Sequence, residues 1–168
     1  KDFINNKTSE KEIILTYFIN KSDGLLYKRL DNGETEKISS EPVYIKNFIL
    51  RQIENNIYLG SNDPKAPGLF LLNFKGEWNK IYENPTNDLV LSPDRKKLAI
   101  IGPNEISILW LKDDNDPPYF KKDQKELILR VGEKIENVFW FKTNWHLIYL
   151  TAVGDVYFIE TDPTGGRD

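Results

Sequence analysis

Residues 89–111, LVLSPDRKKLAIIGPNEISILWL, contain three short apolar runs separated by turn-forming residues. Pro93 fixes φ and removes an amide donor, and Asp94 can bond the backbone ahead of it, so residues 92–94 favour a turn. Residues 102–104, Gly-Pro-Asn, are a second dense cluster of turn formers. The runs are rich in β-branched and large apolar residues, which favour strands. The stretch therefore predicts three antiparallel strands joined as a meander.

Similar apolar runs recur along the chain at spacings of roughly 40 to 50 residues, the range typical of propeller blades. We expect the second and third strands of four units at 13–15 and 25–27, 57–59 and 69–71, 98–100 and 106–108, and 147–149 and 156–158. The pattern predicts an all-β fold, an antiparallel β-propeller of about four blades or an arc of a larger one. As a single domain or partial propeller, its blades would span about 2–40, 41–86, 87–134 and 135–168.

The first and last strands of the units are less regular. A first strand is expected at 43–45, although residues 43–54 have a mixed period that would also suit one helical face. The fourth unit stops after its third strand, so no outer strand is expected there. That gap, together with a chain that starts without Met, favours an arc over a small closed ring. In an arc, Phe139, Trp140 and Phe141 would lie on an exposed face.

The segment SPDRKKLAI, residues 92–100, resembles the SPDGKKIAF-type signature of TolB-like and WD-repeat-like β-propellers. In those families the Ser-Pro-Asp turn joins the innermost strand of a blade to its second strand. Arg95 stands where the family has Gly, so we expect a turn without positive φ here. Residues 138–168 also look like blades in the propellers of bacterial surface proteins with PEGA domains. The resemblance implies architecture and an extracytoplasmic or cell-surface location, and it does not supply a function.

Composition excludes several classes of function. The formal net charge is −3 and the basic residues are dispersed, so a nucleic-acid footprint is not expected. The densest basic cluster, residues 95–97, is expected to be a solvated turn. There is no cysteine, which excludes disulfides and thiolate sites in this chain. No run of eighteen apolar residues occurs, so this segment has no predicted membrane span.

Candidate catalytic and metal-binding residues are few. His146 is the single histidine, and we expect it to be a packed or edge residue rather than a general base. No catalytic serine motif and no phosphate-binding glycine motif occurs. Asp113, Asp114 and Asp116 are the best metal ligands, because clustered carboxylates suit calcium. The alternative is a solvated, proline-terminated loop, and no other cofactor is expected.

The insertion at 112–125 is expected to be a surface loop on one rim, where propellers present variable residues. Asn115, Tyr119 and Phe120 are its candidate binding residues. We expect a non-enzymatic binding or scaffolding module within a larger bacterial cell-envelope or surface protein. Its partner would be another protein or the remainder of a longer chain. Two alternatives are the propeller of a carbohydrate-active or peptidase-associated enzyme, and a structural subunit completed by a strand from another chain.

Overall fold

A computed structural model describes residues 16–115 and 118–161, and these form fourteen strands in four antiparallel sheets. The predicted all-β class is confirmed, and the described residues contain no helix. Among these residues, therefore, no helix exists that could cross a membrane. The chain divides into two compact units, Lys1–Asn84 and Pro85–Asp168.

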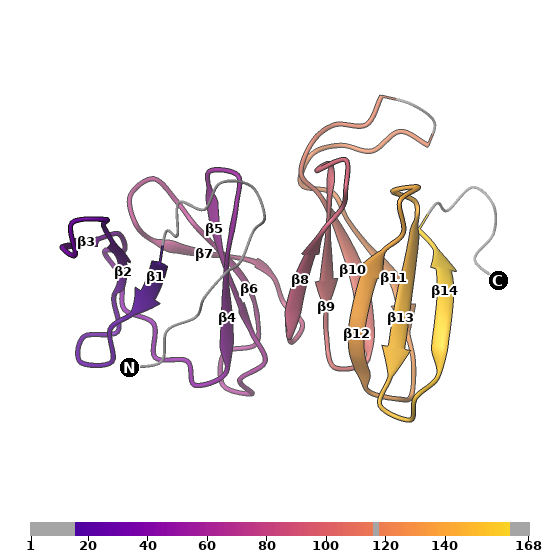
Figure 1. Cartoon of the computed structure of the whole chain (residues 1–168), viewed down its shortest axis with the longest axis horizontal. Coiled ribbons are helices and arrows are strands. Elements are labelled where there is room, and N and C mark those ends of the chain that lie inside the picture. Colours follow the sequence, from indigo (N-terminus) through magenta and orange to yellow (C-terminus); the bar gives the residue numbers. More distant parts are fainter. Residues whose placement is uncertain (1–15, 116–117, 162–168) are drawn as a thin grey trace. The chain divides into compact units, whose positions relative to one another are not determined.

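The first unit contains two sheets of consecutive strands (Figure 1). The three-stranded sheet has the order β1-β2-β3, formed by β1 (Thr16–Ile19), β2 (Leu26–Arg29) and β3 (Thr35–Lys37). The four-stranded sheet has the order β4-β5-β6-β7, formed by β4 (Phe48–Ile53), β5 (Asn56–Ser61), β6 (Gly68–Leu72) and β7 (Trp78–Tyr82). Leu26, Leu50, Ile57 and Leu59 form the buried cluster between them.

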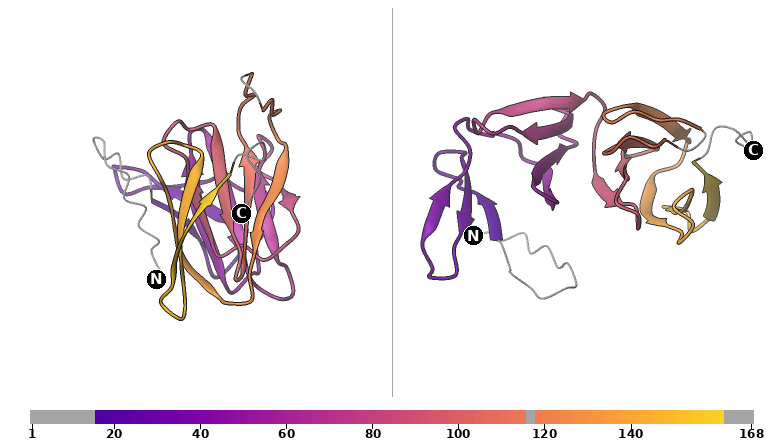
Figure 2. Two further views of the ribbon diagram at one scale, coloured as in Figure 1. Left: turned by 90° about the vertical axis from the view of Figure 1, so that its right-hand side faces the viewer. Right: turned by 90° about the horizontal axis from the view of Figure 1, so that it is seen from above.

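The second unit repeats this plan (Figure 1). Its four-stranded sheet has the order β11-β10-β9-β8, formed by β8 (Asp88–Leu91), β9 (Lys97–Ile101), β10 (Glu105–Trp110) and β11 (Lys125–Arg130). Its three-stranded sheet has the order β12-β13-β14, formed by β12 (Ile135–Trp140), β13 (His146–Thr151) and β14 (Val156–Glu160). One continuous apolar cluster joins the two sheets face to face, and their stacking is visible in Figure 2.

Strands β8, β9 and β10 confirm the meander expected in residues 89–111. Leu91 pairs with Leu98 across the first turn, and Ile101 pairs with Ile106 across the second. Every residue of β9 and β10 is buried, including the apolar runs that predicted these strands and the polar residues Lys97, Glu105 and Ser107. Turn-forming residues and apolar runs were sufficient to predict these strands, because each strand pairs with its immediate neighbour in sequence.

The prediction of a first strand at residues 43–45 was wrong for the β4-β5-β6-β7 sheet. Residues 43–45 lie in an irregular segment, and the strand is β4 (Phe48–Ile53). The segment is fixed by other hydrogen bonds: the Val43 N–H donates to the Gly24 carbonyl at 2.7 Å, and the Lys46 N–H donates to Asp63 Oδ2 at 3.1 Å. The strand expected at 13–15 lies outside the described residues.

The turn that holds Arg95 also differs from expectation. Arg95 has φ 59°, so the turn keeps the left-handed conformation that glycine would adopt more easily. Arg95 N–H donates to the Ser92 carbonyl at 2.9 Å, and Ser92 N–H donates to the Lys97 carbonyl at 2.9 Å. The expectation of a turn without positive φ was wrong, because these hydrogen bonds fix the backbone regardless of which residue occupies position 95.

Candidate functional site

The outer face of the β12-β13-β14 sheet carries a cross-strand row of apolar side chains. Phe139 pairs with Ile148, and Ile148 pairs with Phe158, so the three lie side by side on one face. Phe139 is 58% exposed and Phe158 is 57% exposed. The alternating residues Val138, Leu147 and Tyr149 point to the other face and belong to the core of the second unit.

The preceding sheet, β11-β10-β9-β8, contains an equivalent row of side chains, which the matching turns of the two sheets identify. The turn between β12 and β13 repeats the hydrogen bonds of the Arg95 turn: Asn144 N–H donates to the Phe141 carbonyl, and Phe141 N–H donates to the His146 carbonyl. Asn144 has φ 64°, equivalent to Arg95. When the two turns are aligned, the residues at the positions of Phe139, Ile148 and Phe158 are Val90, Ala99 and Ile108. These three also pair with one another across neighbouring strands.

This equivalent row is buried against the next sheet. Ala99 and Ile108 belong to the core cluster with Leu147 and Tyr149, and Val90 packs against that cluster. At the same positions of the last sheet the side chains are apolar, Phe139 and Phe158 are exposed, and Ile148 between them is half-buried. Exposed apolar patches of this kind are typical of interaction surfaces.

The edge of the last sheet is also open within the described part of the chain. Strand β14 pairs with β13 on one side, and no described strand pairs with its other side. In Figure 2 the yellow strand β14 borders its sheet. Val156 and Tyr157 on this strand are exposed, as is Val153 in the preceding turn. An unpaired strand edge presents N–H and C=O groups that can pair with a further strand.

The single histidine lies at one end of this face. Its ring stacks on Phe158 with centroids 4.8 Å apart, and Nδ1 lies 2.7 Å from Thr143 Oγ1. Nε2 lies 3.9 Å from Glu160 Oε1, which is beyond hydrogen-bond distance. The three side chains therefore do not form a continuous hydrogen-bonded relay. His146 is half-buried, as the sequence predicted, and with Glu160 it gives the apolar row a polar rim.

The terminal face predicted from the sequence is only partly exposed. Phe139 lies on it, whereas Trp140 is half-buried, packs against the core and donates from Nε1 to the Val90 carbonyl at 2.8 Å. Phe141 is half-buried and meets Phe158 edge to face. Alternation along β12 explains the difference, because successive side chains of a strand point to opposite faces.

The insertion between β10 and β11 projects beyond the strand ends (Figure 1). It is closed by backbone pairing between Asp114 and Phe120. Tyr119 is 70% exposed and Asn115 is exposed, so both are accessible to a partner. Phe120 is buried and stacks on Trp110 with ring centroids 3.9 Å apart. Phe120 therefore anchors the loop rather than presenting a contact surface.

The proposed calcium ligands are only partly placed. Asp114 is buried and its Oδ1 accepts a hydrogen bond from Lys96 Nζ at 3.1 Å. Asp113 Oδ1 accepts from the Lys122 N–H at 2.8 Å, and Asp116 lies outside the described residues. Within 16–115 and 118–161 no three acidic or histidine side chains gather as a metal site. The ammonium group of Lys96 already balances the charge of Asp114, and a cation would have to displace it.

Lys97 is a feature that the sequence analysis missed. Its side chain is 0% exposed, so the expectation of a solvated basic turn at 95–97 is wrong for Lys97, whereas Arg95 is exposed and Lys96 is half-buried. The ammonium nitrogen lies 4.2 Å from the ring centroid of Trp145 and 4.9 Å from that of Trp110, and it is 3.3 Å from Asp94 Oδ2. Burial holds the pKa of Lys97 below its ordinary value, although the neighbouring Asp94 acts to raise it.

This buried ammonium joins the two sheets of the second unit. Lys97 and Trp110 are register partners on β9 and β10, whereas Trp145 comes from the turn between β12 and β13. Burial acts to raise the pKa of Asp94. Hydrogen bonds from Ser92 and the Lys96 N–H, together with the charge of Lys97, outweigh this effect, so the pKa lies below its ordinary value and Asp94 stays charged. Because the amine is enclosed, its role is structural. The only sequence signal was the Asp94-x-x-Lys97 spacing of the turn.

Comparison with known proteins finds no family whose model matches this sequence. No curated protein matches it either.

Proposed function

We propose that this chain is a non-enzymatic, propeller-type module that binds a protein partner through its last sheet, β12-β13-β14. The observation that carries the proposal is the apolar row of Phe139, Ile148 and Phe158, in which both phenylalanines are exposed while the counterparts of the row in the preceding sheet are covered. The partner would pack on this row and add a strand to the open side of β14. Strand addition satisfies the edge through main-chain hydrogen bonds, and side-chain contacts supply specificity.

The energetics favour coverage of this face. Burying a Phe or Val side chain contributes about 1.5–3 kcal/mol each, so covering Phe139, Val156 and Phe158 supplies several kcal/mol before the costs of association. The face is rimmed by His146 and Glu160, which resembles the apolar centre and polar rim of protein interfaces. These properties support protein binding more directly than catalysis.

The propeller assignment is part of this proposal. Four consecutive antiparallel meanders, each of three or four sequential strands, support it, because propeller blades have this topology. The matched turns at Arg95 and Asn144 also support it. The assignment to bacterial cell-envelope or surface proteins rests on resemblance alone, chiefly that of residues 138–168 to blades of PEGA-domain surface proteins.

Site-specific photo-crosslinking tests the proposal in the cells that make the protein. A benzophenone amino acid replaces Phe139 in one variant and Phe74 in another, since Phe74 is 95% exposed but lies in the first unit. A third variant carries it at Tyr119 in the insertion. We expect a discrete protein adduct from position 139 and none of the same mass from position 74.

Two further outcomes would overturn the assignment. An adduct from position 119 without one from position 139 would move the interface to the insertion loop. Equal, diffuse labelling from positions 139 and 74 would show that the face has no partner. Substituting Phe158 by Asp in the position-139 variant should abolish the adduct, because Phe158 lies in the same row.

A further inference from the structure

The turn between β2 and β3 contains the single Asn-Gly pair of the chain, Asn32–Gly33. Every residue from 31 to 37 is exposed, and these residues include the turn and the whole of β3. An asparagine that precedes a glycine can react with its own backbone, because the glycine amide nitrogen is able to attack the side-chain carbonyl carbon, Cγ. The turn is therefore a candidate site of chemical modification, in a different unit from the β12-β13-β14 sheet.

The reacting groups lie in a turn that hydrogen bonds define. Leu30 N–H donates to the Glu34 carbonyl at 2.8 Å, and Gly33 N–H donates to the Leu30 carbonyl at 2.9 Å. Glu34 N–H donates to Asn32 Oδ1 at 3.0 Å, and Asn32 Nδ2 donates to Glu34 Oε2 at 2.8 Å. Negative charge develops on Oδ1 when Cγ is attacked, so the Glu34 N–H already stands where it stabilises that charge.

The attacking nitrogen is in an open part of the turn. Gly33 has φ 85°, and no atom lies within 4 Å of a Cβ added to it. Its N–H must leave the Leu30 carbonyl before attack. That hydrogen bond closes a hairpin whose outer strand, β3, has three residues and pairs only with β2 among the described strands. Local opening of so short and exposed a hairpin requires little free energy.

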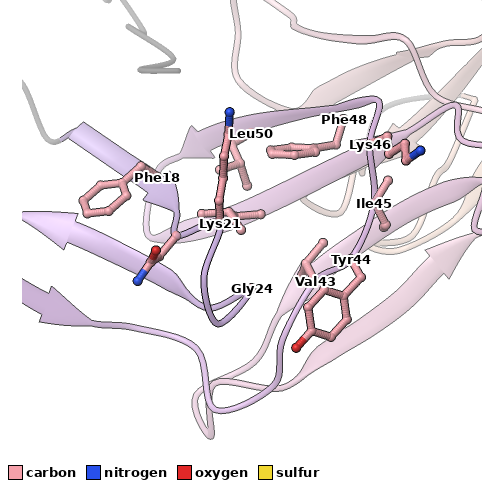
Figure 3. Close-up of a pocket in the computed structure, with 11 residues that line it drawn as sticks. Phe18, Lys21, Gly24, Val43, Tyr44, Ile45, Lys46, Phe48 and Leu50 are labelled. Carbon is pink, nitrogen blue, oxygen red and sulfur yellow. The ribbon is translucent and has the colours of Figure 1, made fainter. Parts of the chain in front are cut away.

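A comparison site lies in the turn between β1 and β2, where Asp23 precedes Gly24. Gly24 is buried, and a Cβ added to it would lie 3.0 Å from Tyr44 Cε1 and 3.1 Å from the Val43 carbonyl oxygen (Figure 3). Gly24 N–H donates to the Asn20 carbonyl at 2.8 Å, and the Gly24 carbonyl accepts from Val43 N–H at 2.7 Å. These contacts fix the peptide group, so its nitrogen is not free to move toward the Asp23 side chain.

The Asp23 side chain is also a poor electrophile. Its Oδ1 accepts a hydrogen bond from the Leu25 N–H at 3.0 Å, and its Oδ2 accepts one from the Tyr27 hydroxyl at 2.8 Å. These hydrogen bonds, that from Leu25 foremost, hold the pKa of Asp23 below its ordinary value, so the group is ionised at neutral pH. A carboxylate resists attack because it already carries negative charge, whereas the amide of Asn32 is neutral.

We propose that Asn32–Gly33 is a site of spontaneous deamidation. The Gly33 nitrogen loses its proton to hydroxide and forms a bond to Asn32 Cγ, and Oδ1 carries the resulting negative charge. The Cγ–Nδ2 bond then breaks, and Nδ2 takes a proton from water and leaves as ammonia. A second water molecule opens the cyclic imide at either of its carbonyl carbons, which leaves aspartate or isoaspartate at position 32.

The modification should loosen the β2–β3 hairpin. Deamidation replaces the Nδ2 donor by a carboxylate oxygen at the position where Nδ2 now lies 2.8 Å from Glu34 Oε2, so a hydrogen bond becomes a contact between like charges. Isoaspartate also adds a methylene to the backbone of the turn that sets Arg29 opposite Thr35. Strand β3 should therefore pair less firmly with β2 in the modified protein.

Tryptic peptide mapping of the whole chain, incubated in the folded state at neutral and mildly alkaline pH, tests the proposal. Cleavage at the basic residues gives separate peptides for the two turns, residues 30–37 and 22–28. We expect peptide 30–37 to gain the mass of deamidation and to separate into aspartyl and isoaspartyl forms. The rate should rise in proportion to the hydroxide concentration. Peptide 22–28 should remain a single species.

Two variants test the chemistry and its consequence. Gly33→Ala crowds the nitrogen with a methyl group, and it should lower deamidation at position 32 to the level of Asn73, which precedes Phe74. Asn32→Asp supplies one product directly, and it should speed hydrogen exchange of the β3 amides. Adding Glu34→Gln to Asn32→Asp should reverse this increase, because it removes the repulsion between the carboxylates.

The proposal is overturned if peptide 30–37 stays unmodified in the folded chain but is modified in the same chain unfolded in urea, because the hairpin would then protect Asn32. Isomerisation of Asp23 at the same rate in the folded chain would contradict the structural difference between the two turns. Unchanged β3 exchange in Asn32→Asp would contradict the loosening of the hairpin. These results do not depend on whether the β12-β13-β14 sheet has a partner.

Discussion

Glycine at position 95 should stabilise the second unit relative to alanine at the same position. Arg95 has φ 59°, and the left-handed conformation costs a residue with a Cβ about 1–2 kcal/mol. Glycine avoids this cost but loses about 0.5–1 kcal/mol more chain entropy on folding. Arg95→Ala keeps the strain and removes the same side chain, so it is the matched reference. Arg95→Gly should therefore exceed Arg95→Ala in unfolding free energy by about 0.5–1 kcal/mol.

Urea unfolding followed by tryptophan fluorescence measures this difference. Trp110, Trp140 and Trp145 all belong to the second unit, so the signal reports mainly on the unit that contains Arg95. Gly154 provides the reverse experiment, since its φ is 94° and no atom lies within 4 Å of an added Cβ. Gly154→Ala should lose stability through the backbone alone.

Gly132 is the control for glycine substitution without backbone strain. It has no positive φ and no atom within 4 Å of an added Cβ, so Gly132→Ala should be neutral or slightly stabilising. The reasoning is refuted if Arg95→Gly is no more stable than Arg95→Ala while Gly154→Ala is destabilised. That pattern would mean that the Arg95 turn relaxes to another conformation when the side chain is removed.

Three further substitutions have definite expected outcomes. In the folded protein the pKa of Lys97 lies below its ordinary value of 10.5. At alkaline pH the folded chain therefore loses this proton before the unfolded chain does, so the unfolding free energy rises with pH. Lys97→Met should remove this rise. The difference between parent and variant, measured by urea unfolding from pH 8 to 10.5, isolates Lys97 from the tyrosines, and a constant difference would contradict the lowered pKa. Gly68→Ala should cost about 2–3 kcal/mol, because φ is 136° and the added Cβ would collide with the Tyr82 carbonyl oxygen; an unchanged melting temperature would contradict that contact. Phe120→Ala should cost about 3 kcal/mol through loss of its buried stack on Trp110, measured by the same fluorescence assay, whereas Tyr119→Ala should be near neutral.

The parts of the fold that depend on neighbours in sequence were predictable. The strands on either side of the 92–94 and 102–104 turns pair directly with one another, so apolar runs and turn residues located them. Strand β14 was also placed, because its β-branched and aromatic residues follow a glycine-containing turn. The strand predicted at residues 43–45 was wrong. Their apolar composition suits a strand, but hydrogen bonds to Gly24 and Asp63 hold this part of the chain in a connecting segment.

The parts that depend on contacts between sheets were not predictable. The burial of Lys97 requires Trp145 from a different sheet, and no local pattern announces that pairing. The burial of Phe120 depends instead on how the insertion folds back onto Trp110 of the preceding strand, which the composition of the loop does not indicate. The exposed face was anticipated at Phe139, but assigning Trp140 to the core required the alternation and exact bounds of β12.

Hydrogen exchange of the β14 amides tests most directly whether the last sheet accepts a partner. The comparison is between the free protein and its complex with the protein that crosslinks at position 139. We predict that alternate amides of Val156–Glu160, those that do not donate to β13, become protected in the complex. Unchanged exchange along β14, with protection confined to other strands or to the insertion loop, would contradict strand addition and the proposed function.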